Sequence, residues 1–365
     1  MIREVWMMLP DGYPDEALYS IIARWQIRTG VFDLRSTSEL LFGRESRRPV
    51  LGIQTGIADL VEKGSMSADE IIYRHTLYPY YKGFRKWLRM NDILNAPHAL
   101  WTDLERELRL ASCPLCIVSD FENFGEPYWH RIHLLPGVMV CPQHNVMLIT
   151  HCPMCGQSIA DSKRAYQLTP TYCPAGHSLL NEIRNLNESL LTFAKDSQLV
   201  LFSGWNGIGA ADLQQVYADV LTERVIPEFE AYPYKTQLRV QRSRFNIGSF
   251  LKNEFYFEIR NELISQFGQE FLDSLPLRPF QEGIVRYRNQ RYEHKKHHYD
   301  WLYRISFRPI DVYSAPIAHI VLLGFLFGSV QNFFEMTAAK LELTGAASEV
   351  AATMEIESNE GDDYY

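Results

Sequence analysis

The residues of this sequence best suited to chemistry are cysteines and histidines that occur in closely spaced pairs between residues 113 and 177. The chain has six cysteines, and each belongs to a pair. The pairs are Cys113 with Cys116, Cys141 with His144, Cys152 with Cys155, and Cys173 with His177. Two ligands separated by two or three residues can bind one ion from a tight turn, and two such pairs complete a tetrahedral zinc site. The spacing predicts two structural Zn²⁺ ions, each held by three thiolates and one imidazole.

Pairing of neighbours along the chain is the arrangement that this order favours. One site then takes Cys113, Cys116, Cys141 and His144, and the other takes Cys152, Cys155, Cys173 and His177. An interleaved cross-brace is the alternative pairing. Three disulfides would leave the two histidines unexplained and would need an oxidising compartment. Catalytic zinc is disfavoured because it keeps an open coordination position, whereas these sets of four are closed.

A second chemical hypothesis is a zinc-dependent hydrolase. It would use His130, His133 or His151 together with Glu122 or Glu126. These groups lack a compact ligand motif, and the His-x-Glu element of the zinc deaminases is absent from the metal region. We therefore expect a protein without catalytic residues.

Composition predicts a folded protein with more than one structural unit. The chain has 365 residues, of which 46% are hydrophobic, and a formal net charge of −8. Residues 335–365 hold eight acids and one base, so the rest of the chain is close to neutral and can carry local basic faces. The first residues lack the pattern of a signal peptide, and reduced thiols suit the cytoplasm. The longest apolar run, Ile317–Phe327, is too short to span a bilayer and predicts a buried helix.

The elements that must position the metal ligands form a mainly α fold. Residues 1–110 are expected to be a helical domain, with one helix opening at Tyr13-Pro14-Asp15-Glu16 and stopping at Gly30. Capping boxes at Ser36–Glu39 and Ser67–Glu70 predict further helix starts. Short helices around a glycine turn resemble a helix-turn-helix, although any small helical bundle gives the same signals.

The remaining boundaries follow from changes in pattern. Residues 111–180 are short apolar pieces between prolines and cysteines, which predicts small β-ribbons carrying a tandem zinc-binding region. Such a stretch cannot fold by burial alone, and a structural zinc ion supplies roughly 10–16 kcal/mol of apparent binding energy. Helical periodicity returns over residues 181–345. Residues 346–365 are expected to be an acidic, solvated tail.

Two stretches of the last helical region interleave basic and aromatic residues, as nucleic-acid-binding faces do. The candidate DNA-binding residues are Arg286, Arg288, Arg291, Lys295, Lys296 and Arg304 in the longer stretch and Lys235, Arg239, Arg242 and Arg244 in the shorter one. Cations neutralise phosphates, while aromatic rings fix register. A solvated helix face gives the same pattern and is the alternative interpretation.

Several motifs, taken in order along the chain, resemble the TniQ/TnsD family of transposon target-selection proteins. They are Tyr13-Pro-Asp-Glu-Ala-Leu-Tyr-Ser-Ile-Ile-Ala-Arg24, His75-Thr-Leu-Tyr-Pro79, Cys113-Pro-Leu-Cys116, Tyr128-Trp129, Leu135-Pro136 and Cys141-Pro-Gln-His144. The His-Thr-Leu-Tyr-Pro motif is similar to the TnsD-like branch, as are Phe267–Leu275, Asp300-Trp301-Leu302 and the stretch from Arg308 to Phe334.

This resemblance implies a non-enzymatic protein of DNA transposition. It implies binding to double-stranded target DNA and recruitment of an AAA+ ATPase regulator, through a surface that includes Asp15, Glu16, Tyr19, Arg24 and Arg28. The alternative is an adaptor that joins an RNA-guided, CRISPR-type complex to the transposition machinery and has little DNA affinity of its own. The family usually has a basic run where this chain has Ile310–Ala315, and attachment-site binders tend to be longer.

Overall fold

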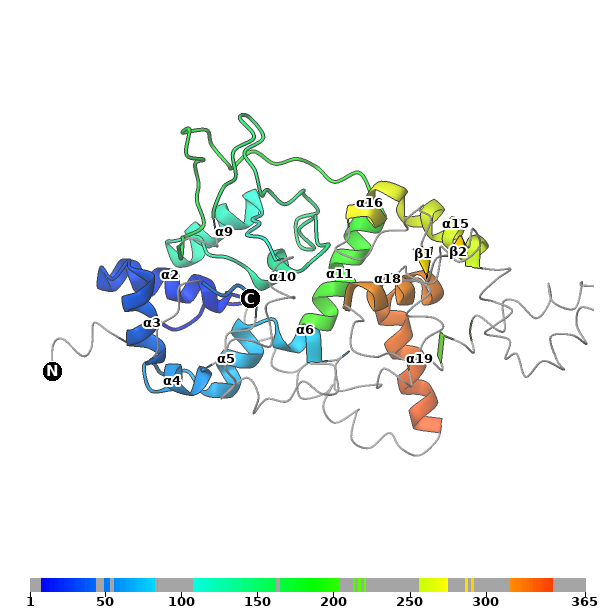
Figure 1. Ribbon diagram of the computed structural model, residues 1–365, viewed down its shortest axis with the longest axis horizontal. Helices are drawn as coiled ribbons and strands as arrows, with labels where there is room; N and C mark the ends of the chain where they lie inside the picture. Colours follow the sequence, from blue (N-terminus) through cyan, green and yellow to red (C-terminus); the bar gives the residue numbers. More distant parts are fainter. Residues whose placement is uncertain are drawn as a thin grey trace, which may run out of the picture.

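The fold is known from a computed structural model that describes part of the chain. The described residues are 8–43, 49–52, 56–82, 84, 108–161, 165–203, 213, 216–217, 220, 256–274, 286–287, 290–291 and 316–343. Over these residues the protein is mainly α, as the sequence predicts, with one two-stranded ladder (Figure 1).

The N-terminal helices pack together around buried aliphatic and aromatic side chains (Figure 1). They are α2 (Leu18–Thr29), α3 (Leu34–Phe42), α4 (Ile57–Val61), α5 (Ala68–His75) and α6 (Tyr78–Lys82). Helix α2 ends at Gly30, whose φ of 73° is the left-handed C-cap conformation that glycine adopts at least cost. The predicted stop at Gly30 is confirmed.

Two predicted helix starts were wrong. Helix α2 begins at Leu18 rather than at Tyr13-Pro14, because Asp15 adopts a φ of 56° and its carboxylate contacts Arg131 at 3.0 Å. Helix α3 begins at Leu34, where the Asp33 carboxylate accepts a hydrogen bond from the Ser36 amide at 2.8 Å. Asp33 thus takes the capping role predicted for Ser36.

The start predicted at Ser67 is confirmed. Ser67 is the N-cap of α5, and its hydroxyl accepts a hydrogen bond from the Glu70 amide. Asp69 and Glu70 lie in the first turn of α5 and Arg74 in the last, which complements the helix dipole.

The central region contains helices as well as loops. Helix α9 (Pro114–Phe124) and helix α10 (Arg131–Leu134) lie within it, and the predicted ribbons are reduced to isolated bridges such as Ser112 with Ile149 and Val140 with Met147. Pro114 explains the unexpected helix: proline is favoured at the first helical position, where its missing amide hydrogen costs nothing. The loops of residues 140–161 and 165–180 project above the helices (Figure 1).

Helix α11 (Glu188–Phe202) lies between the N-terminal helices and the C-terminal helices. It contacts α6 on one side and the C-terminal helix α18 (Pro316–Phe327) on the other (Figure 1). Helices α15 (Tyr256–Phe267), α16 (Gln269–Ser274) and α19 (Val330–Leu343) pack around this pair, and strands β1 (Arg286–Tyr287) and β2 (Gln290–Arg291) are antiparallel.

The buried helix predicted from the apolar run is confirmed as α18, in which Pro316 to Leu326 are all buried. Among the described residues, no single helix has the length and apolar character needed to cross a membrane, although the bent pair α18 and α19 passes that test on length and composition.

One contiguous hydrophobic core runs from Leu9 through Trp129 and Phe193 to Phe334. Phe84 stacks on His319 of α18 at a centroid distance of 4.8 Å, so parts of the predicted N- and C-terminal domains pack directly together. The boundaries near residues 110 and 180 stay predictions. The predicted tail lies outside the described residues.

Candidate metal centre

The first group of predicted ligands converges on one point. The ligand atoms of Cys113, Cys116, Cys141 and His144 all lie within 4.8 Å of one another. The His144 Nδ1 atom is 3.5 Å from Cys113 Sγ, 3.4 Å from Cys116 Sγ and 3.6 Å from Cys141 Sγ. The Sγ atoms of Cys116 and Cys141 are 3.8 Å apart.

These separations fit a tetrahedral ion. With a metal–sulfur bond of about 2.3 Å and a metal–nitrogen bond of about 2.0–2.1 Å, tetrahedral edges are about 3.8 Å between two sulfurs and about 3.5 Å between sulfur and nitrogen. The observed edges agree with both values. The donor set of three thiolates and one imidazole is typical of structural zinc and could hold a metal ion.

Two local structures bring this first cluster together. Cys113 is the N-cap of α9 and Cys116 lies in its first turn, so both sulfurs sit at the positive end of the helix dipole. The other pair sits on a tight turn in which the Cys141 amide donates to the Val146 carbonyl, with Asn145 at a φ of 53°. The three cysteines are buried, and His144 is partly exposed.

The second group also converges, at the tip of the projecting loops. The ligand atoms of Cys152, Cys155, Cys173 and His177 lie within 4.8 Å of one another. Cys155 Sγ is 3.8 Å from Cys173 Sγ, and His177 Nδ1 is 3.4 Å from Cys173 Sγ and 3.8 Å from Cys152 Sγ.

Both halves of this second cluster are turns closed by glycine. Gly156 and Gly176 donate their amides to the Cys152 and Cys173 carbonyls at 2.8 Å, with φ values of 70° and 83°. Cys155 is exposed, in contrast to all three cysteines of the first cluster. In both clusters the structure brings together neighbouring pairs, as expected from the favoured pairing.

A short strap, residues 165–167, fastens the second cluster to the body of the protein. The Tyr19 hydroxyl donates to the Ala165 carbonyl at 2.7 Å and accepts from the Gln167 amide at 3.0 Å. The Trp129 indole donates to the Gln167 carbonyl at 2.7 Å. The ring of Tyr166 packs against that of Tyr19. The strap therefore connects the metal-binding loops to α2.

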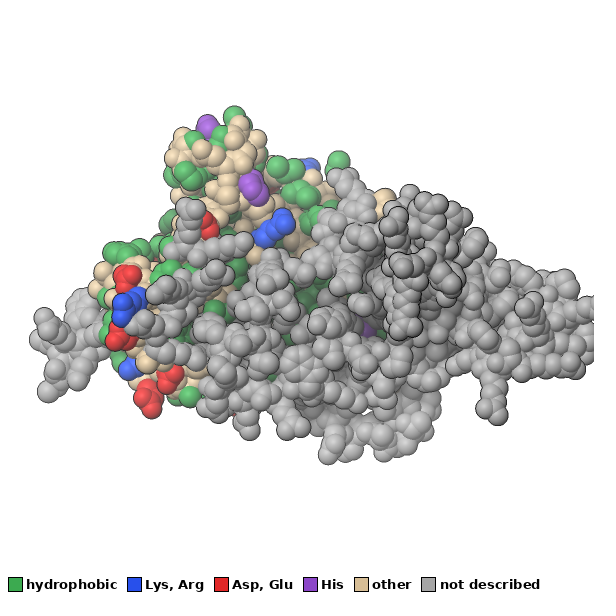
Figure 2. Space-filling model, viewed as in Figure 1, with side chains coloured by type: hydrophobic (Ala, Val, Ile, Leu, Met, Phe, Trp, Pro, Cys, Tyr) green, Lys and Arg blue, Asp and Glu red, His purple; other side chains and the backbone are tan. Residues whose placement is uncertain are grey.

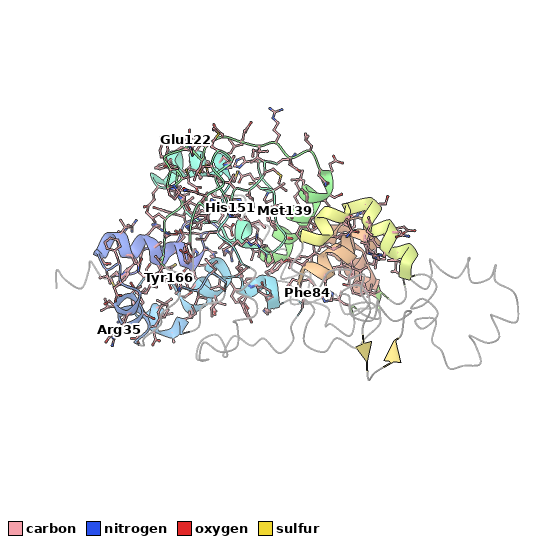
Figure 3. All side chains as sticks on the ribbon, turned by 45° about the horizontal axis from the view of Figure 1, so that its top comes forward. Arg35, Phe84, Glu122, Met139, His151 and Tyr166 are labelled. Carbon is pink, nitrogen blue, oxygen red and sulfur yellow. The ribbon has the colours of Figure 1, made fainter. Side chains whose placement is uncertain are left out.

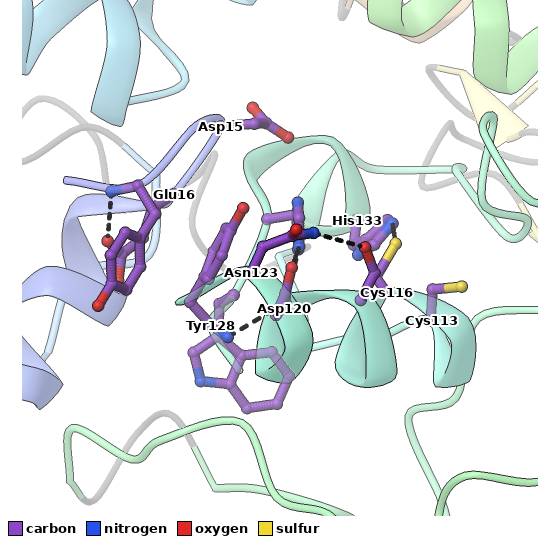
Figure 4. A network of polar contacts seen from close by, with 12 residues as sticks. Asp15, Glu16, Cys113, Cys116, Asp120, Asn123, Tyr128 and His133 are labelled. Carbon is purple, nitrogen blue, oxygen red and sulfur yellow. Dashed lines mark hydrogen bonds and ion pairs between the residues drawn. The ribbon is translucent and has the colours of Figure 1, made fainter. Parts of the chain in front are cut away.

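Buried polar side chains of α9 and α10 lie beside the first cluster (Figure 4). His133 Nε2 lies 4.0 Å from Cys116 Sγ, and the His133 ring packs against that of His130. His130 hydrogen-bonds the Asp120 carboxylate at 3.1 Å. Burial lowers the pKa of His130, but the hydrogen bond and charge of Asp120 outweigh burial, and the net direction is upward.

Four of the five residues predicted to face a partner make contacts inside the protein. Arg24 donates to Glu16 at 2.7 Å and to Glu126 at 2.8 Å, while Asp15 pairs with Arg131. Glu16, Tyr19 and Arg24 are buried, and Arg28, with half of its side chain exposed, also pairs with Glu126. As placed, Arg28 is the member of the set most open to another molecule, and partner contact by these residues stays a prediction.

The predicted DNA-binding residues lie almost wholly outside the described residues. Only the backbones of Arg286 and Arg291 are described, and they face each other as partners in the β1–β2 ladder. The other eight candidates fall outside. DNA contact by all ten stays a prediction.

The residues of the hydrolase hypothesis do not share one site. His130 and His133 lie beside the first cluster, whereas Glu126 pairs with Arg24 and Arg28. Glu122 and His151 lie apart on the exposed surface (Figure 3).

The sequence did not predict the roles of two residues in this region, one of which, His133, it offered only as a hydrolase candidate. Arg131 fixes α10 by contacting Asp15 and the Tyr73 and Thr76 carbonyls, and His133 approaches the first cluster from the same helix. The contacts of Arg131 and the position of His133 both depend on tertiary packing. The one available signal was a cluster of histidines close to a metal-binding pair.

The surface gives less information than the interior. Charged side chains of both signs gather over the N-terminal helices, whereas the lobe of the metal-binding loops presents mainly uncharged and histidine side chains (Figure 2). Within the described residues, this view shows no large basic face.

Part of the chain is similar to proteins of a known family. Residues 7–148 match the TniQ family model, which includes the first cluster and ends before the second. The chain is similar to the Escherichia coli protein described as "Transposon Tn7 transposition protein TnsD", with 24% identity over 155 residues. That alignment covers 38% of this chain and 30% of the relative.

Proposed function

We propose that this protein, whose residues 7–148 match the TniQ family model and which is similar to TnsD, selects the target site for DNA transposition. The family match carries the proposal. The matched residues include both the helical N-terminal part and the first metal cluster, so one family model extends over both parts. The relative's printed name places it in transposition, and the activity of this chain is inferred from that similarity.

The two clusters serve this function as structural zinc sites. Each offers four donors with tetrahedral separations, which is a closed set without room for a substrate. The zinc ions would hold α9 and the projecting loops in place, where burial alone is insufficient. The protein would then act by binding, with no catalytic residue.

Target binding requires partners. We assign double-stranded target DNA to the basic stretches around Arg286–Arg304 and Lys235–Arg244, because cations there can neutralise phosphates. We assign an AAA+ ATPase regulator of the same transposon to the N-terminal helical part, where Arg28 is exposed. The alternative is an adaptor that docks on an RNA-guided complex and binds DNA weakly.

A salt-dependent binding assay separates these two candidates. We expect the zinc-loaded chain to bind duplex target DNA with an affinity that falls steeply as salt rises, and the R286A/R288A/R291A triple variant to reduce both the affinity and the salt dependence. Arg184→Ala is the matched control, because its side chain is 84% exposed and lies outside the proposed face. Absent or salt-insensitive binding, together with capture of an RNA-guided complex, would favour the adaptor.

Recruitment is tested separately. The tagged chain should retain the transposon's AAA+ ATPase in a pull-down, and Arg28→Glu should weaken retention without changing zinc content. If R28E lost both zinc and the ATPase, the variant would be misfolded. Full retention of the ATPase by R28E would contradict the assigned surface.

A further inference from the structure

His133 lies against the first metal cluster without belonging to its four ligands. Its side chain is buried, and its Nε2 atom lies 4.0 Å from Cys116 Sγ (Figure 4). Its other nitrogen, Nδ1, is buried without a hydrogen-bond partner. A buried polar atom without a partner is costly, so other contacts must fix this ring in place.

The charge of the site gives the ring a role. A divalent ion with three thiolates carries one net negative charge, and burial of that charge is unfavourable unless hydrogen-bond donors point at the sulfurs. In the second cluster, a backbone amide of the turn supplies one: the His177 amide donates to Cys173 Sγ at 3.3 Å.

The first cluster is built differently. Its first pair opens helix α9, and the Cys113 side chain makes no capping hydrogen bond there. Pro114 has no amide hydrogen to offer. His133 Nε2 lies outside the ligand turns and is in position to donate to the Cys116 sulfur.

We propose that His133 is a positioning residue of the first metal site, with its Nε2–H donating to the Cys116 thiolate. The inference depends on the proposed binding of zinc. It also connects the site to the N-terminal helices, because α10 carries both His133 and Arg131, and Arg131 is held by Asp15 and the Tyr73 carbonyl. The hydrogen bonding of the metal site then depends on the docking of α10.

Zinc release measures this role in the full-length protein. Zinc content of the native chain is determined first, and two ions per chain are expected; none would refute the metal proposal itself. Release is then followed with a chromogenic chelator for the native chain, His133→Phe and His133→Gln. Phe keeps an aromatic ring without a donor, and Gln keeps an N–H donor. Cys155→Ala identifies the phase that belongs to the second site.

We expect H133F to weaken zinc binding at the first site by about 10- to 100-fold, as loss of outer hydrogen bonds to metal ligands does, and H133Q to restore most of it. The second phase should not change. In cobalt-loaded protein, H133F should shift the thiolate-to-metal charge-transfer band of the first site. His151→Phe is the control, since His151 is exposed beside Cys152.

Two results would overturn the proposal. One is an unchanged first phase and an unchanged cobalt spectrum in H133F. The other is an equal loss in H133F and H133Q, which would assign His133 to packing rather than to hydrogen bonding.

Discussion

Arg24 connects three separate parts of the protein through one guanidinium group. It pairs with Glu16 of the N-terminal segment and with Glu126 after α9, and it lies 3.8 Å from the centroid of the Tyr13 ring. Burial raises the pKa of Glu16 to about 7, and the charge of Arg24 opposes that rise. A buried carboxylate that loses its paired cation must either ionise at high cost or take up a proton.

We therefore expect Arg24→Met to lower the free energy of unfolding by about 3–5 kcal/mol at pH 8, and by less at pH 5, where Glu16 is more readily protonated. Urea unfolding of the zinc-loaded protein measures this change. Arg28→Met is the control, because the half-exposed Arg28 pairs with Glu126 at the surface and should cost less than about 1 kcal/mol. Equal costs for the two variants would contradict the assignment.

Asp196 is a second buried acid, in this case without a cation among the described residues that line its pocket. Burial raises its pKa to about 7, and the amide of Val330 at the start of α19 offsets this only in part. Between pH 4 and 7 the folded chain keeps a proton on Asp196 that the unfolded chain has lost. Stability contributed by this group therefore falls as pH rises through that window.

Asp196→Asn removes that titration. We expect the variant to exceed the native chain in unfolding free energy by on the order of 2 kcal/mol at pH 8 and to match it near pH 4. The difference between the two proteins, measured at each pH by urea unfolding, cancels titration at the metal clusters. Glu188 lines the same pocket, so Glu188→Gln is the matched control. A constant difference across pH would refute the prediction.

At the scale of elements, the two metal clusters support different structures. The first lies at the N-terminal end of α9 with its cysteines buried, whereas the second lies in loops and exposes Cys155. We expect Cys116→Ala to increase hydrogen exchange in α9, α10 and α2. Cys155→Ala should increase exchange mainly in residues 152–180, including the strap. The physical reason is that loss of a ligand releases the backbone which that ion cross-links.

Hydrogen-exchange mass spectrometry resolves these regions by peptide. Met154→Ala is the control for the second variant, because Met154 is 71% exposed in the same turn and is no ligand. Identical exchange maps for C116A and C155A would show that the clusters act as one cooperative unit.

Helix starts show why local signals mislead at this scale. Ser36 and Glu39 have the spacing of a capping box. However, Asp33 lies three residues before Ser36, and its carboxylate accepts the hydrogen bond of the Ser36 amide. Asp15 and Glu16 resemble acids of a first helical turn, yet both carboxylates bind arginines distant in the sequence or on α2. Tertiary ion pairs overrode the local helix preference.

At the scale of the whole molecule, α11 makes the N-terminal part depend on the C-terminal helices. Tyr80 and Tyr81 of α6 are buried, and α6 contacts α11, which lies beyond the predicted boundary at residue 180. A chain of residues 1–180 should therefore have a lower melting temperature than the full chain and bind a hydrophobic dye. Deletion of residues 346–365, the predicted tail, should leave both properties unchanged.

Thermal unfolding and dye fluorescence provide the comparison. A fragment of residues 1–180 as stable as the full chain would instead show that the N-terminal part and the metal region fold independently, as the predicted boundary at residue 180 allows.

Some features followed from the sequence because they depend on short-range chemistry. Ligand pairs within a turn, the glycine stop at Gly30, the serine cap at Ser67 and the apolar run of α18 each need only a few neighbouring residues. The sequence alone therefore determined the mainly α character and the two groups of potential metal ligands.

Tertiary structure decided what these features contact. The burial of Glu16 and Arg24, the approach of His133 to Cys116 and the position of α11 between α6 and α18 join residues far apart in the chain or set their exposure. Such contacts arise when whole helices pack together. Burial of apolar area selects how the helices are arranged, and the charged side chains that become buried must then form ion pairs or hydrogen bonds. No local pattern encodes that selection.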